Sequence, residues 1–523
     1  MSVRRRLASV PFLVLLALLA PSASAGASSD SKPEDDGIRL GVARLAWLEG
    51  DVAVARGDAA EGWRPGAVND PLTTGDRLRV AAGGRAEVQL RGAVIHLAPG
   101  TELAFPDLSL EDRSVTLSAG TVSVRVFDVR GAGSLEVATP SVSVALELPG
   151  DYRFDVGDSG GTAISIRRGR ARAATAEGGV TLGWGERMRV TASPRPEYDV
   201  VTLGRGDAWD RRVDQRSARF RLVRSAAHVH ADVLGIDDLD AWGDWEETAE
   251  RGWAWFPKVS LADWMPYRSG RWIWREPWGW AWLSDEPWGW APYHHGRWAI
   301  VRSRWAWLPD EPKDPGPSFL PAVVTFVGAG PGGVGPLGPD GYVGWFPLAP
   351  GEPLQPWWVR VEGPTGDSSF RYLHRDRALY LPHAIFARGR FGESDLVHDA
   401  ALLRDLRNAP VVRSGLPVDP ERERVRTPPE ASGAPASAGL RSALPIRRTK
   451  TPAPAGRATP SPAPTPARAA PVPPSRSPRL TPRTPEASPA AAPPWASVPT
   501  PAPSAGAARS APRPTPQPGP RRM

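Results

Sequence analysis

Short runs of alternating apolar and polar residues fill residues 37–193. The clearest of these runs are Val52–Val54, Ala86–Leu90, Val115–Leu117, Val122–Val126, Val142–Leu146 and Ile164–Ile166. Gly, Pro and Asp separate the runs at intervals of about ten residues, which is typical of short strands joined by turns. Because alternate side chains of a strand point to opposite faces, each run has one apolar face and one polar face. The pattern predicts a mainly β domain, a roll or sandwich around a single core.

The periodicity changes after this domain. Residues 205–227 carry many Arg and Asp, and Trp209, Val213 and Phe220 recur near one face of a helix. With Asp207 as the N-cap, they predict a charged connecting helix from about Gly206 to Ala227. A second short helix is expected over Asp395–Leu406.

Residues 242–307 contain fifteen of the 23 tryptophans and an internal repeat. The sequence from Trp264 to Trp272 recurs as Trp290 to Trp298, and Glu-Pro-Trp-Gly-Trp occurs at both 276–280 and 286–290. Each unit has the order of short strand, Pro/Gly turn and short strand. We therefore predict a tryptophan-rich module of β-hairpins over residues 228–350.

Two segments follow the module. Residues 351–415 are expected to form a small extension with a short helix. From residue 416 to residue 523 Pro, Ala, Ser, Thr and Arg dominate, and Trp495 is the one aromatic residue beyond Thr427. Such a composition cannot bury enough apolar area to offset chain entropy, so a long disordered tail is predicted.

The first residues have the order of a secretion signal. Arg4, Arg5 and Arg6 precede the apolar stretch Leu7–Ala20, and Ala23-Ser-Ala25 is a small-residue cleavage site. We expect a signal peptide at residues 1–25, a disordered linker at 26–36, and an exported protein of the periplasm or cell surface. No later stretch is apolar for about 18 residues, so no transmembrane segment is expected after cleavage.

Composition narrows the chemistry. The chain has no cysteine, which excludes disulfides, thiol catalysis and cysteine-ligated zinc. The net charge of +7 would suit nucleic acid, but the basic excess lies largely in the tail and export separates the chain from most nucleic acid. A nucleic-acid partner is therefore not expected.

The first domain resembles the FecR family. The resemblance rests on Gly75-Asp76-Arg77-Leu78, Gly84–Val88 and Pro99-Gly100-Thr101, with Tyr152–Val156 and Gly185-Glu186 further on. It implies a periplasmic module, which in iron-uptake sensors relays a signal from an outer-membrane transporter to a sigma factor. We expect no counterpart here of the cytoplasmic segment and membrane helix of those sensors, so the domain is expected to serve as an extracytoplasmic binding or scaffold unit.

Residues 205–390 are similar to a Trp/Pro-rich family of unknown function that commonly follows a FecR domain in exported bacterial proteins. The resemblance rests on the aromatic spacing, the repeated Gly-Arg-Trp and the flanking Leu234–Asp240 and Gly344–Pro347. It implies export and this domain order, and it brings no catalytic residues.

The tryptophans allow two interpretations. Each buries on the order of 200 Å², far more in sum than a soluble monomer exposes, so most must form the module's own core. Alternatively a few rings stay exposed and stack on sugars, with Arg271, Asp285, His294 and Arg297 binding hydroxyls. The candidate ligand-binding residues are Tyr267, Trp272, Trp274, Trp278, Trp280, Trp288, Trp290, Tyr293 and Trp298.

The sequence favours no enzyme and no cofactor. Nucleophile elbows and phosphate loops are missing, and the pairs His228/His230 and His294/His295 lack a further ligand at metal-site spacing. The expected function is binding or scaffolding in the envelope, with a polysaccharide such as peptidoglycan or an envelope protein as partner. The alternative is FecR-type extracytoplasmic signalling with a separate membrane partner, and an unrecognised hydrolase is the third hypothesis.

Overall fold

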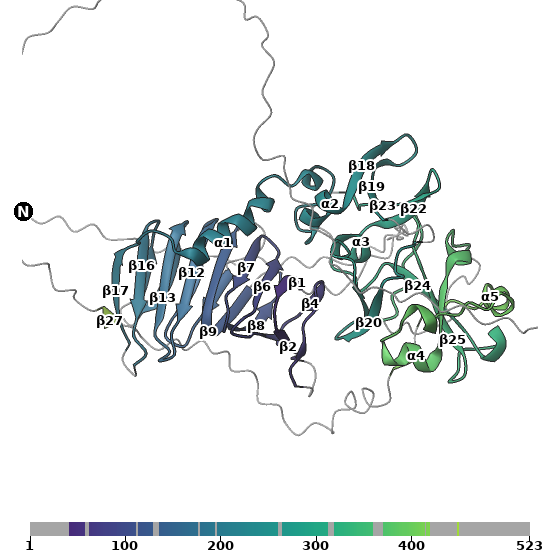
Figure 1. Ribbon diagram of the computed structural model, residues 1–523, viewed down its shortest axis with the longest axis horizontal. Coiled ribbons are helices and arrows are strands. Elements are labelled where there is room, and N and C mark those ends of the chain that lie inside the picture. Colours follow the sequence, from purple (N-terminus) through teal and green to yellow (C-terminus); the bar gives the residue numbers. More distant parts are fainter. Residues whose placement is uncertain are drawn as a thin grey trace, which may run out of the picture. The chain divides into compact units, whose positions relative to one another are not determined.

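The computed structural model describes residues 41–57, 62–110, 113–128, 135–175, 178–193, 196–259, 264–311, 318–358, 370–413, 415–418 and 447–448 (Figure 1). The expected signal peptide, the linker at 26–36 and nearly all of the tail at 416–523 lie outside these residues. No helix of the described part is long and apolar enough to span a membrane.

Residues 43–202 form a β-roll, as the alternation predicted. Its strands are β1 (Ala43–Glu49), β2 (Val52–Ala55), β3 (Arg64–Pro65), β4 (Asp70–Leu72), β5 (Arg77–Val80), β6 (Arg85–Leu90), β7 (Ala93–Leu97), β8 (Glu102–Leu108), β9 (Arg113–Val126), β10 (Leu135–Ala138), β11 (Ser143–Leu146), β12 (Gly150–Val156), β13 (Thr162–Arg168), β14 (Ala171–Thr175), β15 (Gly178–Leu182), β16 (Glu186–Val190) and β17 (Glu197–Thr202). A two-residue strand, β27 (Arg447–Arg448), pairs with β17 in parallel.

Two sheets share the long strand β9. One sheet has the order β4-β1-β6-β7-β9-β12-β13-β16-β17, and the other has the order β3-β2-β5-β8-β9-β10-β11-β14-β15. The strand passes from one sheet to the other at Gly120, whose φ of 86° lies in a region that glycine adopts readily. A Cβ there would lie 2.7 Å from the Thr101 backbone, so the crossing requires glycine.

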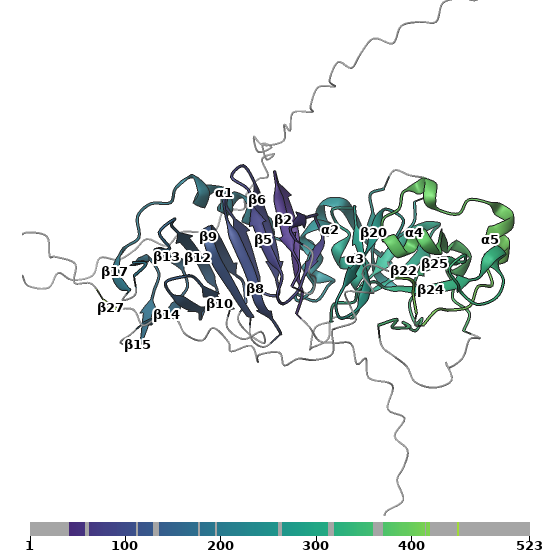
Figure 2. The ribbon, with the colours of Figure 1, turned by 90° about the horizontal axis from the view of Figure 1, so that it is seen from below.

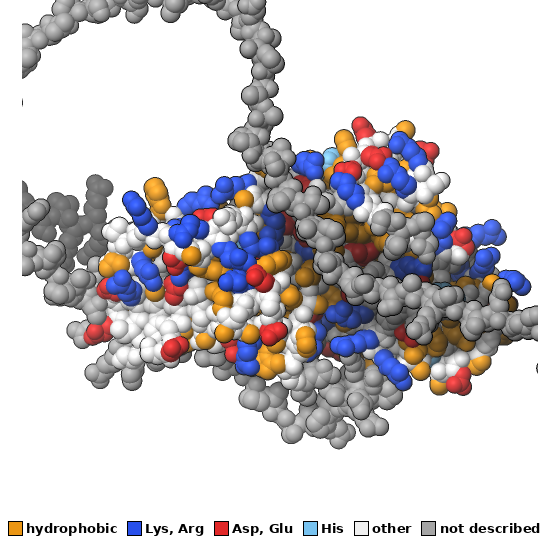
Figure 3. Space-filling model, viewed as in Figure 1, with side chains coloured by type: hydrophobic (Ala, Val, Ile, Leu, Met, Phe, Trp, Pro, Cys, Tyr) orange, Lys and Arg blue, Asp and Glu red, His pale blue; other side chains and the backbone are white. Residues whose placement is uncertain are grey.

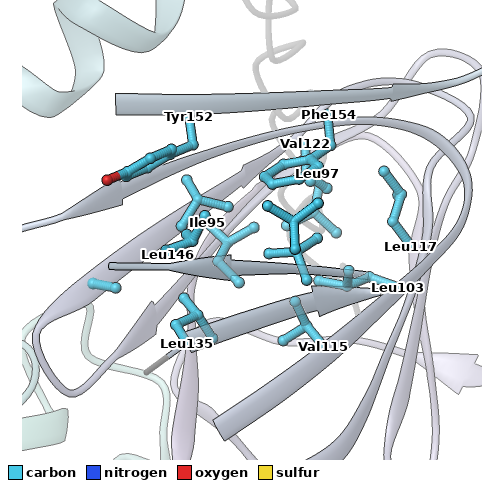
Figure 4. Close-up of a cluster of buried hydrophobic side chains, with 14 of the residues drawn as sticks. Ile95, Leu97, Leu103, Val115, Leu117, Val122, Leu135, Leu146, Tyr152 and Phe154 are labelled. Atoms are coloured by element: carbon cyan, nitrogen blue, oxygen red, sulfur yellow. The ribbon is translucent and has the colours of Figure 1, made fainter. Parts of the chain in front are cut away.

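The aliphatic core lies between the two sheets (Figure 4). In β12, Tyr152, Phe154 and Val156 are buried, whereas the residues between them are partly exposed. This alternation is the period of two that the sequence predicted. The core residues are mainly Val, Leu, Ile and Ala, which need no polar partner.

The connecting segment is helical over a shorter stretch than expected. Helix α1 (Ala208–Ser217) begins with Asp207, whose side chain accepts from the Asp210 backbone N–H in a capping box, as predicted. Two 3-10 turns, η1 (Ala218–Arg221) and η2 (Arg224–Ala227), replace its expected second half. In these turns the side chain of Arg219 donates to Glu87, and the backbone N–H of Ser225 donates to Asp240.

Hairpins build the tryptophan-rich module, as predicted. After α2 (Ile236–Trp242) come β18 (Gly243–Thr248), β19 (Gly252–Pro257), β20 (Gly270–Arg275), β21 (Gly279–Ser284), α3 (Trp290–His294), β22 (Arg297–Val301) and β23 (Arg304–Leu308). β18, β19, β23 and β22 form one sheet, and β20 and β21 form a separate hairpin.

The sequence repeat produces equivalent hairpins. Trp272 faces Trp282 across β20 and β21, and Trp298 faces Trp307 across β22 and β23. The segment before each hairpin differs, since Tyr267 lies in a turn with φ of 63° whereas its counterpart Tyr293 lies in α3. The helix departs from the uniform hairpins that the sequence predicted.

A third sheet completes this core. β24 (Val324–Ala329), β25 (Tyr342–Pro347) and β26 (Leu379–Pro382) are antiparallel, with the 3-10 turns η3 (Pro331–Gly333) and η4 (Arg375–Arg377) and helix α4 (His383–Arg388) beside them. The helix expected over 395–406 is split into the turn η5 (Glu393–Asp395) and α5 (Ala400–Leu406), because Asp399 caps α5.

Candidate functional site

The nine aromatic residues proposed for ligand binding lie in the core of the module. Trp272, Trp274 and Trp280 come from the β20–β21 hairpin, Trp290 and Tyr293 from α3, and Trp298 from β22. Trp274 is half-buried, and the other eight are at most 3% exposed. A sugar cannot reach buried rings, so these residues do not provide the exposed shelf that stacking requires. The geometry favours their structural role.

Hydrogen bonds fix the orientation of several of these indoles. Trp280 Nε1 donates to the carbonyl oxygen of Pro417 at 2.8 Å, and Trp298 Nε1 donates to that of Pro292 at 3.0 Å. The hydroxyl of Tyr267 donates to the carbonyl of Tyr293 at 2.9 Å. Each ring therefore fills volume and also satisfies a buried carbonyl outside the β-strands, in α3 or at Pro417.

A partly buried carboxylate lies among these rings. Glu286 accepts hydrogen bonds from Trp264 Nε1, the Ser284 hydroxyl and the Tyr293 hydroxyl, all at 2.8 Å. The pKa of Glu286 is raised, because the effect of burial exceeds the opposite effect of these three hydrogen-bond donors. With its donors supplied by the module itself, Glu286 acts as a packing anchor.

The polar side chains that were proposed to bind sugar hydroxyls instead contact other residues of the chain. Arg271 Nη1 lies 3.3 Å from Asp285 Oδ1, and Arg297 donates to the Gly296 carbonyl. His294 is buried with Nδ1 2.7 Å from the Leu320 carbonyl, and burial lowers its pKa to about 3.

In the described part of the chain no three His, Asp or Glu side chains, the histidine pairs included, are grouped so that they could hold a metal ion. His228 lies between Trp245 and Trp253, with ring centroids 4.5 and 4.4 Å away. His295 is buried, and burial lowers its pKa to about 4.

Helix α1 covers a polar cluster that sequence reasoning missed. His96 Nε2 lies 2.9 Å from Ser217 Oγ, and its Nδ1 lies 3.4 Å from Glu87 Oε2. The order of groups is that of a hydrolytic triad, yet Ser217 is fully buried and burial lowers the pKa of His96 to about 4. Burial alone would raise the pKa of Glu87, but Arg219 and its neighbours lower it. These groups fasten α1 to the sheet.

The space under α1 is correspondingly small. A hollow lined by Arg125, Tyr152, Arg167 and Asp210 has a volume of about 20 Å³. That is room for about one water, whereas ligand pockets measure roughly 300 Å³ or more.

Two buried arginines join the roll and the module. Arg44, in β1, is fully buried and pairs with Asp238 at 2.6 Å, and it also donates to the Pro287 carbonyl. Its guanidinium lies 5.9 Å from the centre of the Trp290 ring. A residue of the roll is therefore held by α2 and by the turn before α3.

Arg275 makes the reciprocal connection. It lies at the end of β20, is fully buried, and pairs with Asp76 Oδ2 at 2.8 Å. Asp76 also binds Arg56 Nη1 at 2.8 Å and accepts from the Thr73 backbone N–H. The sequence indicated Asp76 through its motif, but its partner, 199 residues away, left no local signal.

Basic and acidic side chains are mixed over the face shown in Figure 3. Trp184, in the turn between β15 and β16, is the most exposed aromatic residue of the described part, at 81%, and lies between two glycines. Tryptophan is enriched among the residues that contribute most to binding in protein interfaces.

Family models match two parts of the chain. The FecR protein model matches residues 76–172, and a family of unknown function, DUF6600, matches residues 236–352. No protein of curated function gives a significant match.

Solved structures resemble the chain only in part. Two crystal structures, at 2.50 and 1.65 Å resolution, are of a protein from Parabacteroides distasonis described as a candidate anti-sigma factor. Both are 21% identical, with TM-scores of 0.23 and 0.22 and coverage of 27% and 24% of this chain. The chain spans 63% and 59% of their lengths.

The two matched segments lie within the β-roll and within the tryptophan module, which are joined at Arg44 and Arg275. The chain therefore contains a FecR domain followed by a DUF6600 domain, a family whose function is unknown.

Proposed function

We propose that this protein is a non-catalytic regulatory protein of the FecR type, which acts outside the cytoplasm by binding another protein. The observation that carries the proposal is the FecR domain at residues 76–172. Because its resemblance is to modules that relay signals by protein contact, the expected partner is an envelope protein.

The geometry of the module supports this function over polysaccharide binding. Eight of the nine proposed sugar-stacking residues are buried, and the polar groups near them bind within the chain. The module acts instead as a rigid brace on the roll, because the buried side chains of Arg44 and Arg275 join the two through ion pairs.

Site-specific photo-crosslinking in living cells tests the proposal. A photoreactive residue at position 184 samples the exposed turn of the roll, and one at Arg302, in the turn between β22 and β23, is the matched control. We expect an envelope protein crosslinked from position 184 and not from position 302. Deletion of the gene should change transcription, with recovery by the wild type and a weaker recovery by Trp184→Ala.

Three results would contradict the proposal. The first is an absence of position-184 adducts together with unchanged transcription in the deletion strain. The second is retention of the wild type on peptidoglycan that folded Trp278→Ala and Trp288→Ala variants lose, which would restore the glycan hypothesis. The third is an uncleaved protein in the cytosol, whereas export predicts a mature N-terminus near Gly26.

A further inference from the structure

The two ends of the β-roll are covered differently. At one end β1 and β4 lie beside the module, where Arg44 pairs with Asp238 and the Asn69 amide donates to the Glu286 carbonyl (Figures 1 and 2). At the other end lie β15 and β17, the last strands of the two sheets. An uncovered edge strand invites pairing with other chains, so this end needs a cover of its own.

The backbone of β17 presents hydrogen-bonding groups to that edge. Glu197 and Thr191 bond each other on the β16 side, because the Thr191 N–H donates to the Glu197 carbonyl and the Glu197 N–H donates to the Thr191 hydroxyl. Successive residues of a strand turn their backbone groups in opposite directions, so Tyr198 turns its N–H and C=O outward.

The strand that pairs there comes from the far end of the chain. β27 runs parallel to β17, with Arg447 opposite Glu197 and Arg448 opposite Tyr198. The sequence Arg-Arg-Thr-Lys at 447–450 is basic, while β17 contributes Glu197 and Asp199.

The tether is long enough for such a return. Pro417 is bonded to Trp280 in the module, and 28 residues, 419–446, precede β27. Fully extended, they span up to roughly 95 Å. Nine strands from β4 to β17 cover about 40 Å.

We propose that the segment at Arg447–Arg448 is a built-in cover strand for the β17 edge of the FecR domain. It acts in cis and must leave before a strand of another chain can add to β17. The free edge is then a β-augmentation site for an extended, basic segment. This inference is independent of the proposed function, since the occupant is part of the same chain.

Amide hydrogen exchange of the full chain tests the cover strand. Arg447→Pro combined with Arg448→Pro removes the donor that faces β17, whichever of the two residues supplies it. The matched control is Arg521→Pro with Arg522→Pro, which loses the same charges from another Arg-Arg pair. We expect the Tyr198 amide to exchange roughly tenfold faster in the first variant and at the wild-type rate in the control.

Two outcomes would overturn the proposal. One is an equal Tyr198 exchange rate in the wild type and the 447/448 variant. The other is protection that increases with protein concentration, because the occupant would then be a second copy. Dimerisation of the 447/448 variant alone, seen by light scattering, would support the proposal because it shows an edge that the segment normally covers.

Discussion

The roll and the module solve the same problem with different side chains. Neither contains a cysteine, and both are built from short strands. The roll buries aliphatic residues between two long sheets, whereas the module buries indoles among small hairpins. Aliphatic packing has no direction, but an indole also donates a hydrogen bond, as Trp307 does to the His295 carbonyl at 2.8 Å. In a domain of short hairpins many carbonyls have no partner in a β-ladder. Tryptophan fills volume there and also donates hydrogen bonds to these carbonyls.

The largest expected effect is at the junction between the two regions. Asp76→Ala leaves Arg56 and Arg275 buried without their shared carboxylate, which should lower the free energy of unfolding by about 3–5 kcal/mol. The unfolding curves recorded by tryptophan fluorescence and by circular dichroism should also no longer coincide, because the roll and the module no longer unfold together. A single transition with wild-type midpoint would show that the ion pairs do not couple them.

Because an indole in the core of the module also donates a hydrogen bond, even a conservative substitution of a tryptophan should lower the free energy of unfolding markedly. Trp298→Phe keeps a ring but leaves the Pro292 carbonyl unsatisfied, so the free energy of unfolding should fall by about 1–3 kcal/mol beyond the effect of lost volume. In the roll, Ile164→Val should lower it by only about 0.5–1.5 kcal/mol. Urea denaturation measures both. Equal losses would mean that the indole hydrogen bond contributes little.

Acid should destabilise the module more steeply than the roll. Burial lowers the pKa of His294 to about 3 and of His295 to about 4, and the roll has one such group, His96. Between about pH 6.5 and pH 4 the unfolded chain binds more protons, so stability present above pH 6.5 is lost as pH falls, by up to about 1.4 kcal/mol per pH unit for each histidine.

Glu286 partly opposes this trend. Because burial raises its pKa, its contribution strengthens as pH falls. Denaturation between pH 7 and pH 5 should show a steep slope that His294→Gln reduces. An unchanged slope in a folded His294→Gln variant would contradict the assignment.

The smallest effect is expected at an exposed ion pair. Arg271 and Asp285 are 28% and 58% exposed and lie 3.3 Å apart, so Arg271→Met should change the free energy of unfolding by less than about 1 kcal/mol. Thermal denaturation of Arg271→Met and of Asp76→Ala compares a surface ion pair with a buried one. A comparable loss of stability in the two variants would contradict the expected difference between them.

The sequence was sufficient for the elements whose signal is local. The alternation in β11 and the cap at Asp207 were both predicted, and the hairpins of the repeat follow from its Pro/Gly turns. Other features depend on residues far apart in the chain: Arg219, in the turn η1 after α1, meets Glu87, and Asp76 meets Arg275, only after folding. The burial of the tryptophans was favoured by their number, but which rings are buried depends on the whole core.

Exchange of the indole N–H protons tests the central claim most directly. In the folded full chain, the Nε1–H groups of Trp280, Trp298, Trp307 and Trp345 donate to buried carbonyls. We predict that their resonances exchange as slowly as the backbone amides of the core and do not shift when soluble peptidoglycan fragments are added. Fast exchange, or shifts that saturate with added glycan, would contradict the account and identify these rings as a binding surface.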